Sequence, residues 1–209
     1  LCMDEHNRLW IGTNGDGVYI LEDGKVNKIK NKDLYYSAVW DIDITRDHRV
    51  FIATDNGLFI KDGARYKYYT TGEGLVNNSI WTIAEDKFNN VWLGTNKGIS
   101  VLTDYGFVNY KTENGLTSDI IYSLKFDKQD KLWVGTEKGV EKLTTNKKGE
   151  IEKTVFYGKE EGFVSIECNS NAATVDTSGN MWFGTIDGIM MYNNFEKQEN
   201  KYIPKTYIS

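Results

Sequence analysis

The stretch Val91-Trp92-Leu93-Gly94-Thr95, followed by the polar turn Asn96-Lys97-Gly98, recurs throughout this sequence. Each copy consists of an aromatic residue, a hydrophobic residue, a glycine or alanine, and a threonine. The aromatic residues that begin the five copies are Trp10, Phe51, Trp92, Trp133 and Trp182. They are separated by 41, 41, 41 and 49 residues. A spacing this regular indicates a structural repeat of about 40 residues.

Two further markers follow the same spacing. An aspartate lies six residues before the aromatic residue in four copies, and Gly-Leu or Gly-Phe pairs fall between copies. The markers are Asp4, Asp86, Asp127 and Asp176, and the pairs at 74–75, 115–116 and 162–163. An aspartate that follows a strand accepts backbone N–H groups of the next turn. We therefore interpret the repeated aspartates as structural.

Each repeat contains four short segments with strand character, as at residues 79–86, 91–95, 99–102 and 107–112, with turn residues between them. Repeated four-stranded units of this length are typical of a β-propeller. A β-sandwich is the alternative, but it needs no fixed spacing. The sequence thus predicts an all-β fold of about five antiparallel propeller blades. We expect the repeated tryptophans to fill the space between blades and the glycine after each one to allow close approach.

The predicted blade boundaries follow from the repeat. The blades are expected at about 1–36, 37–78, 79–119, 120–167 and 168–193, with an exit segment at 194–209. Because 209 residues hold only about five repeats, and most propellers close with more blades, we expect a piece of a larger propeller. Such a piece would form an open or strained arc, or would close with strands from another chain.

Composition excludes several classes of protein. The net charge of −5 and the pI near 5.2 argue against a nucleic-acid partner. Apolar runs are too short for a transmembrane helix, and the start Leu1-Cys2-Met3-Asp4 is not a signal peptide. The 28 aromatic residues (6 Trp, 13 Tyr, 9 Phe) exclude a disordered chain. Cys2 and Cys168 are expected to be thiols, although a disulfide is conceivable if the first and fifth blades meet.

Motifs for catalysis or cofactors are missing from the sequence. His6 and His48 have no second ligand at metal-binding spacing, and the segment at 14–17 lacks the acidic ligands of a calcium loop. We therefore predict no catalytic residue, no metal and no cofactor.

Residues that differ between repeats are better candidates for a ligand site than residues that repeat. The inner strands begin with Trp40, Trp81, Tyr122 and Asn171. These aromatic residues belong either to the upper edge of the core between blades or to the mouth of the central channel. Polar side chains beside aromatic rings suit a sugar, but they equally suit loop capping. The candidate residues are Tyr35, Tyr36, Trp40, Asn78, Trp81, Asp119, Tyr122, Glu167, Asn169 and Asn171, with Asp119 and Glu167 as the only acids expected at these positions.

The repeat, an aspartate six residues before Trp-hydrophobic-Gly-Thr and a following glycine, resembles the two-component regulator propeller repeat. Segments 166–173, 181–188 and 202–204 resemble the last blade of the sensors that contain it, which leads into an Ig-like domain. The second copy departs from the pattern, because it has Phe51, Ala53 and Thr45 at three of the repeated positions. Looser packing of that blade is the expected consequence.

The resemblance implies a function. Such repeats form the extracytoplasmic sensor region of bacterial hybrid two-component histidine kinases. It implies a ligand-binding module without catalysis, an oligosaccharide or similar small ligand, and a homodimer. Its location would be the periplasmic or extracellular side of the inner membrane, with membrane attachment through segments outside this chain. Two alternatives stay open: a carbohydrate-active propeller enzyme (glycosidase or lyase), and a non-catalytic scaffold for protein interactions.

Overall fold

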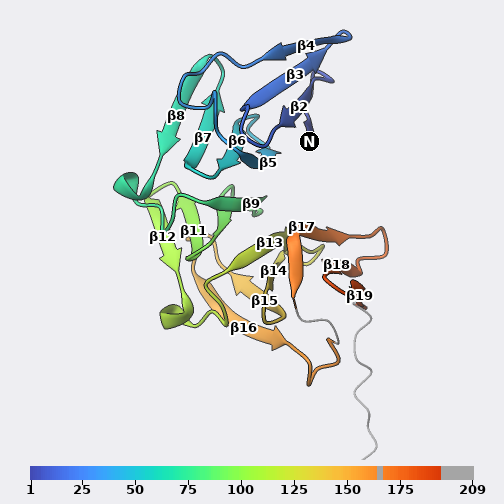
Figure 1. Ribbon diagram of the computed structural model, residues 1–209. Coiled ribbons are helices and arrows are strands. Elements are labelled where there is room, and N and C mark those ends of the chain that lie inside the picture. Colours follow the sequence, from blue (N-terminus) through green and yellow to red (C-terminus); the bar gives the residue numbers. More distant parts are fainter. Residues whose placement is uncertain (164–166, 194–209) are drawn as a thin grey trace, which may run out of the picture.

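The computed structural model describes residues 1–163 and 167–193, which form five antiparallel β-sheets (Figure 1). The first sheet contains β1 (Cys2–Met3), β2 (Leu9–Gly12), β3 (Val18–Glu22) and β4 (Lys25–Lys28), and the second contains β5 (Val39–Ile44), β6 (Val50–Thr54), β7 (Gly57–Asp62) and β8 (Arg65–Tyr69). The third contains β9 (Ile80–Glu85), β10 (Val91–Thr95), β11 (Gly98–Thr103) and β12 (Gly106–Tyr110). The fourth contains β13 (Ile121–Phe126), β14 (Lys131–Thr136), β15 (Val140–Thr145) and β16 (Ile151–Tyr157), and the fifth contains β17 (Cys168–Val175), β18 (Met181–Thr185) and β19 (Gly188–Tyr192).

Within each sheet the strands follow one another in chain order, so each sheet is a meander that begins with its inner strand. The five sheets are the blades of a β-propeller, which confirms the predicted all-β fold. The fifth blade has three strands within the described residues, where the sequence predicted four. Each sheet lies within one of the predicted blade ranges, and the predicted exit segment at 194–209 lies outside the described residues.

Consecutive blades are held together by apolar cores. Four clusters of buried hydrophobic residues fill the four spaces between neighbouring blades. The repeated aromatic residue lies in each cluster: Trp10 between the first and second blades, Phe51 in the next, Trp92 in the third and Trp133 in the fourth. All four are at most 1% exposed. A single blade cannot bury both of its faces, so stacking provides the hydrophobic stabilisation.

The repeated aspartate connects a turn to the tryptophan of its own blade. In the third blade, Oδ1 of Asp86 accepts the backbone N–H groups of Phe88 and Asn90, and Oδ2 accepts the indole Nε1 of Trp92 at 3.1 Å. The same indole bond joins Asp4 to Trp10, Asp127 to Trp133 and Asp176 to Trp182, at 2.8–2.9 Å. This gives the six-residue spacing a physical reason, because the carboxylate satisfies a donor that burial would otherwise leave without a partner.

The second blade departs from the repeat at both positions of this pair. Phe51 has no indole N–H, and the position of the aspartate is occupied by Thr45. The Thr45 hydroxyl donates to Oδ1 of Asp47 at 2.5 Å, and Oδ2 of Asp47 accepts Nε of Arg49 at 2.7 Å. Phe51 is fully buried and Ala53 is 0% exposed, so the looser packing expected for this blade is not observed. The acceptor is absent where the donor is absent.

The glycine two residues after the tryptophan leaves room for the inner strand of the next blade. A Cβ on Gly94 would lie 2.6 Å from Cγ2 of Thr82 in the same blade and 2.7 Å from Cγ2 of Ile121 in the next. Both distances are shorter than any real contact between carbon atoms. Glycine at this position therefore lets the inner strand of the following blade approach closely, as the sequence predicted.

The Gly-Leu pairs between copies mark a short 3-10 turn that leads to the next blade. Gly74 ends the turn Thr71–Glu73 with φ of 111°, a conformation that favours glycine, and Leu75 is then buried in the core between the second and third blades. The pair at 115–116 follows the turn Thr112–Asn114 in the same way. The hydrophobic residue anchors each connection between blades.

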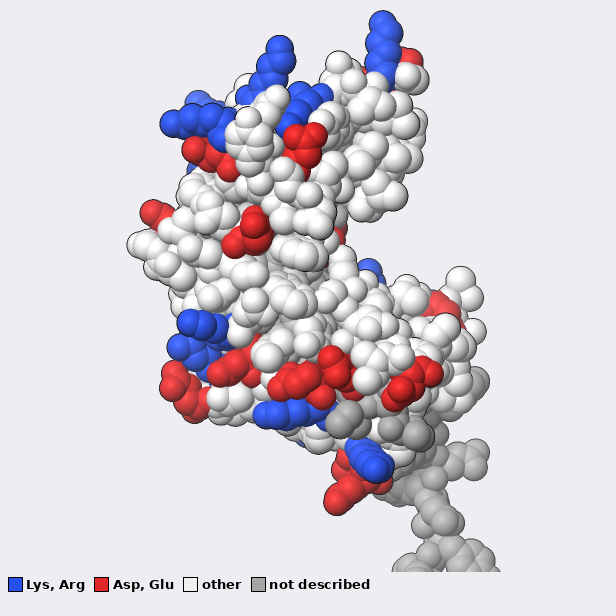
Figure 2. Space-filling view, viewed as in Figure 1, with Lys and Arg blue, Asp and Glu red and all other residues white. Residues whose placement is uncertain are grey.

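The first and fifth blades are not joined by any hydrophobic cluster within residues 1–163 and 167–193. Their inner strands face a shared central cavity, and the molecular surface is hollowed on this side (Figure 2). Trp182, the last copy of the repeated tryptophan, is only half-buried, and Met191, its partner on β19, is 45% exposed. The face of the fifth blade that is turned away from the fourth blade thus lacks the apolar packing found between consecutive blades.

Candidate functional site

Three aromatic rings from three consecutive blades form a continuous row. The rings of Trp40 and Trp81 stack with centroids 5.8 Å apart and an angle of 17° between their planes. The ring of Tyr122 lies 5.4 Å from Trp81 at an angle of 47°. The three residues occupy matching positions near the start of the inner strands β5, β9 and β13. We call Trp40, Trp81 and Tyr122 the aromatic row.

A β-bulge in each inner strand explains why these rings leave the sheet. In β5, Val39 pairs with Thr54 and Asp41 pairs with Ala53, so Trp40 is the extra residue between them. Trp81 and Tyr122 occupy the same place in the bulges of β9 and β13. A bulge bends the strand and redirects the side chain of the extra residue. Regular strand alternation, which would put Trp40 on the same side as Ile42 and Ile44, is therefore broken at this point.

The structure separates the two positions that the sequence allowed for these rings. Trp40 is 47% exposed and belongs to none of the four apolar cores, so the assignment to the core is wrong for this residue. Trp81 is half-buried, and its indole Nε1 donates to Oγ of Ser79 at 3.1 Å. Tyr122 packs partly against the core around Trp133. The row is thus supported by the core at one end and open at the other.

Glu167 lies close to the Tyr122 end of the row. The pKa of the Tyr122 hydroxyl is raised, mainly by burial and to a smaller extent by the negative charges of Glu167 and Glu137. Asn169 follows in the irregular part of β17, where its side chain donates to the carbonyl of Thr185 at 3.0 Å. The amide of Asn169 is therefore engaged within its own blade, and Glu167 and Glu137 act on Tyr122 through their charge.

Two other candidates cap the connections between blades. Oδ1 of Asn78 accepts the backbone N–H of Thr71, and Oδ1 of Asp119 accepts that of Thr112, each at 2.7 Å. The two residues are 41 positions apart and make the same bond in successive repeats. The capping interpretation that we weighed for them therefore accounts for their positions.

Tyr35 and Tyr36 form a separate cluster. Their rings meet edge to face, with centroids 4.9 Å apart, and Nζ of Lys28 lies 3.3 Å from the centroid of Tyr35. Tyr36 is 78% exposed. This cluster rests on β4 of the first blade, and no ring contact joins it to the aromatic row within the described residues.

Asn171 reaches into the centre of the molecule. Its backbone has φ of 51° within the irregular β17, and its side chain contacts two other blades. Oδ1 of Asn171 accepts the hydroxyl of Thr82 at 3.3 Å, and its amide bonds to the carboxylate of Asp41. Asn171 thus links the fifth blade to the second and third, and it is a structural bridge as well as a lining residue of the cavity.

The central cavity contains acids that the sequence analysis missed. It is lined by residues of the inner strands of all five blades, among them Asp41, Asp43 and Glu85. We expected Asp119 and Glu167 to be the only acids near the channel, and that expectation is wrong. The signal was present in the sequence: Asp41 and Asp43 alternate with Ile42 and Ile44 along β5, so they face away from the core between the first and second blades.

Burial affects the acids of the cavity strongly. It raises the pKa of Asp41 to about 6, against the hydrogen bonds that the carboxylate accepts from the backbone of Ile83 and from Asn171. Burial also raises the pKa of Asp43, with Lys125 opposing this and Glu85 adding to it. Two carboxyl groups in the cavity are therefore harder to ionise than ordinary aspartates.

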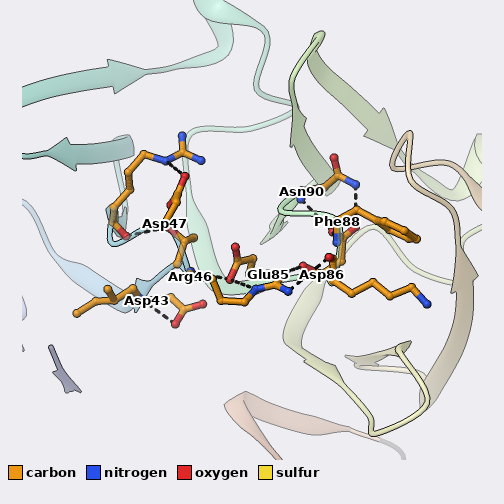
Figure 3. A network of polar contacts seen from close by, with 11 residues as sticks. Asp43, Arg46, Asp47, Glu85, Asp86, Phe88 and Asn90 are labelled. Carbon is orange, nitrogen blue, oxygen red and sulfur yellow. Dashed lines mark hydrogen bonds and ion pairs between the residues drawn. The ribbon is translucent and has the colours of Figure 1, made fainter. Parts of the chain in front are cut away.

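Arg46 connects the second blade to the third through Glu85 and Asp86. Its backbone N–H and its Nε donate to Oε2 of Glu85 at 3.0 and 3.1 Å, and its guanidinium also donates to the carbonyl of Asp86 (Figure 3). Figure 3 shows Asp43 on the side of Glu85 that faces the second blade. Arg46 fixes the carboxylate of Glu85 in position.

The two histidines lie outside both sites, whereas Cys2 is one of the residues that line the central cavity. His48 Nδ1 is 2.9 Å from one oxygen of Glu5, and His6 Nε2 is 3.7 Å from the other. Within residues 1–163 and 167–193 no cluster of three or more His, Cys, Asp or Glu side chains could hold a metal ion. Both cysteines are free, and burial raises the pKa of the Cys168 thiol to about 11.

Comparison with protein families identifies the repeat. Residues 74–97 and 115–138 match the model of the two component regulator propeller family. These segments contain the Gly-Leu pair, the bulged aromatic residue and the Trp-hydrophobic-Gly-Thr stretch of the third and fourth blades. The resemblance recognised from the sequence is thereby confirmed. No curated protein matches the chain.

Solved structures share the fold. The extracellular domain of a putative hybrid two component system from B. thetaiotaomicron superposes with a TM-score of 0.75 and 21% identity, covering 94% of this chain and 29% of that one. A second such domain from the same organism gives 0.66 and 18%, covering 92% of this chain and 33% of that one. Virginiamycin B lyase from Staphylococcus aureus gives 0.66 and 16%, covering 91% of this chain and 68% of that one. The chain therefore spans about one third of the sensor structures that it resembles.

No helix in the described residues is both long and apolar enough to cross a membrane.

Proposed function

We propose that this chain is a propeller module of a bacterial two-component signalling protein and that its aromatic row binds an oligosaccharide or a similar small ligand. The observation that carries the proposal is the row itself. Rings from three blades lie side by side, and the outermost, Trp40, is 47% exposed. The family match of the third and fourth blades and the likeness to extracellular domains of two-component systems support the signalling part.

The row suits a sugar for physical reasons. A pyranose ring has an apolar face that stacks on an aromatic ring and an edge of hydroxyl groups that needs hydrogen-bond partners. Trp40, at the open end of the row, is 47% exposed and offers ring surface to a sugar, while Trp81 and Tyr122 support it from the neighbouring blades. The charge of Glu167 acts on Tyr122, and we propose this carboxylate as an acceptor at that end of the row. Rings held by bulged strands are fixed before the ligand arrives, which lowers the entropic cost of binding.

Signalling requires that the ligand favour one arrangement of the protein over another. The row is built from three separate blades, so a ligand that lies along it contacts all three. We propose that binding is communicated to an output domain through the placement of this module on the periplasmic or extracellular side of the inner membrane. The proposed module has no catalytic activity of its own. A homodimer is the arrangement in which we expect the signal to be passed on.

The experiment is a screen of a glycan panel by thermal shift, followed by calorimetry on the glycans that stabilise the protein. We expect Trp40→Ala and Trp81→Ala to abolish binding of those glycans. The matched control is Tyr105→Ala, which removes an aromatic side chain that is 94% exposed in a turn of the third blade, and binding should be unchanged. Stabilisation by no glycan, or binding that survives both tryptophan substitutions, overturns the assignment of the row.

The same samples test the enzymatic alternative. Each glycan that binds is incubated with the protein, and the products are separated by chromatography. We expect the glycans to remain intact. Cleavage that is lost in Glu167→Gln would identify an enzyme and would contradict a module without catalytic activity.

A further inference from the structure

The central cavity has an acidic wall with few cations to balance it. Asp41, Asp43 and Glu85 line it from the second and third blades, and Lys125 is the cationic side chain among its lining residues in the described parts of the chain. The charges of Glu85 and Lys125 both act on Asp43. Among the side chains that line the cavity, three carboxyl groups therefore accompany one ammonium group, and Arg46 pairs with Glu85 from outside the lining.

Glu85 is incompletely paired. Its side chain is only 10% exposed, and Oε2 accepts both N–H groups of Arg46. Oε1 is buried and has no hydrogen-bond partner among the described residues. An ionised oxygen that is removed from water without a donor is costly. This residue lines the cavity, so a donor that enters the cavity is in a position to supply the missing bond.

The rest of the lining limits the kind of ligand. Of the aliphatic residues in the lining, Ile44 is half-buried and adds apolar surface, whereas Ile42 and Leu124 are almost fully buried in the cores between blades. Since no cluster in the described residues could hold a metal ion, a divalent cation does not account for the arrangement. A ligand that fits carries a positive charge, several N–H donors and a short apolar chain.

We propose that the central cavity binds an organic cation with N–H donors, an ammonium or guanidinium group on an alkyl chain, through the carboxylates of Asp43 and Glu85. Charge-assisted N–H bonds to carboxylates are the strong kind of hydrogen bond. The proposal concerns side chains other than those of the aromatic row. Glycan binding and cation binding can therefore each fail while the other stands.

The test is calorimetric titration of the whole chain with agmatine, which has a guanidinium and an ammonium group, and with putrescine, which has two ammonium groups. Choline is the comparison ligand, because it carries the charge without an N–H donor. Both amines should bind, and choline should bind at least about tenfold more weakly. Comparing the two amines shows which of the two groups the site prefers.

Asp43→Asn and Glu85→Gln keep the size of each side chain and the oxygens that accept the bonds from Ile44 and Arg46. Each should weaken amine binding about tenfold or more. Lys125→Met removes the opposing charge and should strengthen binding several-fold, a gain that a folding defect cannot produce. Glu22→Gln and Asp23→Asn make the same chemical changes at exposed positions in the first blade and should leave affinity unchanged.

The outcomes decide the proposal. Absence of amine binding, equal binding of choline, or amine affinity that is the same in Asp43→Asn and Glu85→Gln as in the control variants overturns it. Weakened binding in these two variants together with strengthened binding in Lys125→Met supports it.

Discussion

The indole Nε1 of Trp92 donates a hydrogen bond of 3.1 Å to Oδ2 of Asp86, six residues earlier in the chain. The other oxygen of Asp86 holds the turn between them. One carboxylate thus fixes both the hairpin of a blade and the large ring that fills the space to the next blade. Four of the five blades contain this pair.

A double-mutant cycle on this pair should reveal strong coupling. Asp86→Ala and Trp92→Phe should each destabilise the protein, but Asp86→Ala should cost less when the indole N–H is already absent. We expect a coupling of about 1.5–3 kcal/mol, the value of a hydrogen bond to a charged group. Urea unfolding of the four proteins measures it. Strict additivity of the two single changes would contradict the pairing.

Stability should depend on pH through Asp41. Its pKa is about 6 in the folded protein and 3.8 in the reference state, so the folded protein retains a proton that the unfolded chain has released in between. The free energy of unfolding should therefore fall as pH rises from about 4 to 6 and then stay lower by about 3 kcal/mol. Asp41→Asn should remove this part of the profile. Parallel profiles for the two proteins in urea unfolding would refute the assignment.

Asp4 should act in the opposite direction and at lower pH. Against the effect of burial, hydrogen bonds from Trp10 and Arg8 lower its pKa to about 2. The unfolded chain takes up a proton first as pH falls below about 4, so the stability that Asp4 provides should disappear between about pH 4 and 2. Asp4→Asn should show a smaller loss than the parent protein over this range in acid titrations followed by circular dichroism. An unchanged loss would mean that Asp4 is not responsible.

Gly94→Ala should destabilise the protein by about 1–3 kcal/mol or more. The added methyl group would overlap Thr82 and Ile121, which belong to two inner strands in contact. Gly72→Ala is the matched control, because its added methyl group would meet only Oγ1 of Thr70 at 3.4 Å. Thermal unfolding compares the two. Equal melting temperatures would show that the inner strands do not require the close approach.

The two types of tryptophan should respond differently to removal. Trp92→Ala empties a fully buried site and should cost about 3–5 kcal/mol. Trp40→Ala removes a ring that is 47% exposed and lies outside the apolar cores, so its cost should be much smaller. Chemical denaturation of both variants measures the difference. If Trp40→Ala lowered the free energy of unfolding as much as Trp92→Ala does, Trp40 would have to be assigned to the core after all.

Much of the fold could be predicted from the sequence because propeller blades are made by local hairpins. Three patterns follow from contacts within one blade or between successive blades: the spacing of 41 residues, the turn glycines and the repeated tryptophans. The exception in the second blade is also visible in the sequence, because Phe51 lacks the indole N–H donor and Thr45 lacks the carboxylate acceptor. The positions of Asn78 and Asp119 as loop caps also follow from their spacing.

The functional surfaces depended on features that spacing does not reveal. The bulges at Trp40, Trp81 and Tyr122 change the side of the sheet to which a residue points, and strand alternation cannot foresee a bulge. The aromatic row also requires three blades to be placed side by side.

The sequence by itself determined the repeat, the all-β class and the structural role of the repeated aspartates, because these are periodic and local. The hydrogen bond from each tryptophan to its aspartate became visible only in the structure. Tertiary structure alone decided that Asp43 and Glu85 share a cavity and that Asn171 reaches two other blades. The physical reason is that the inner strands converge on a common centre, so residues more than 40 positions apart share one low-dielectric space. There their charges act on one another, and that interaction has no counterpart in the linear pattern.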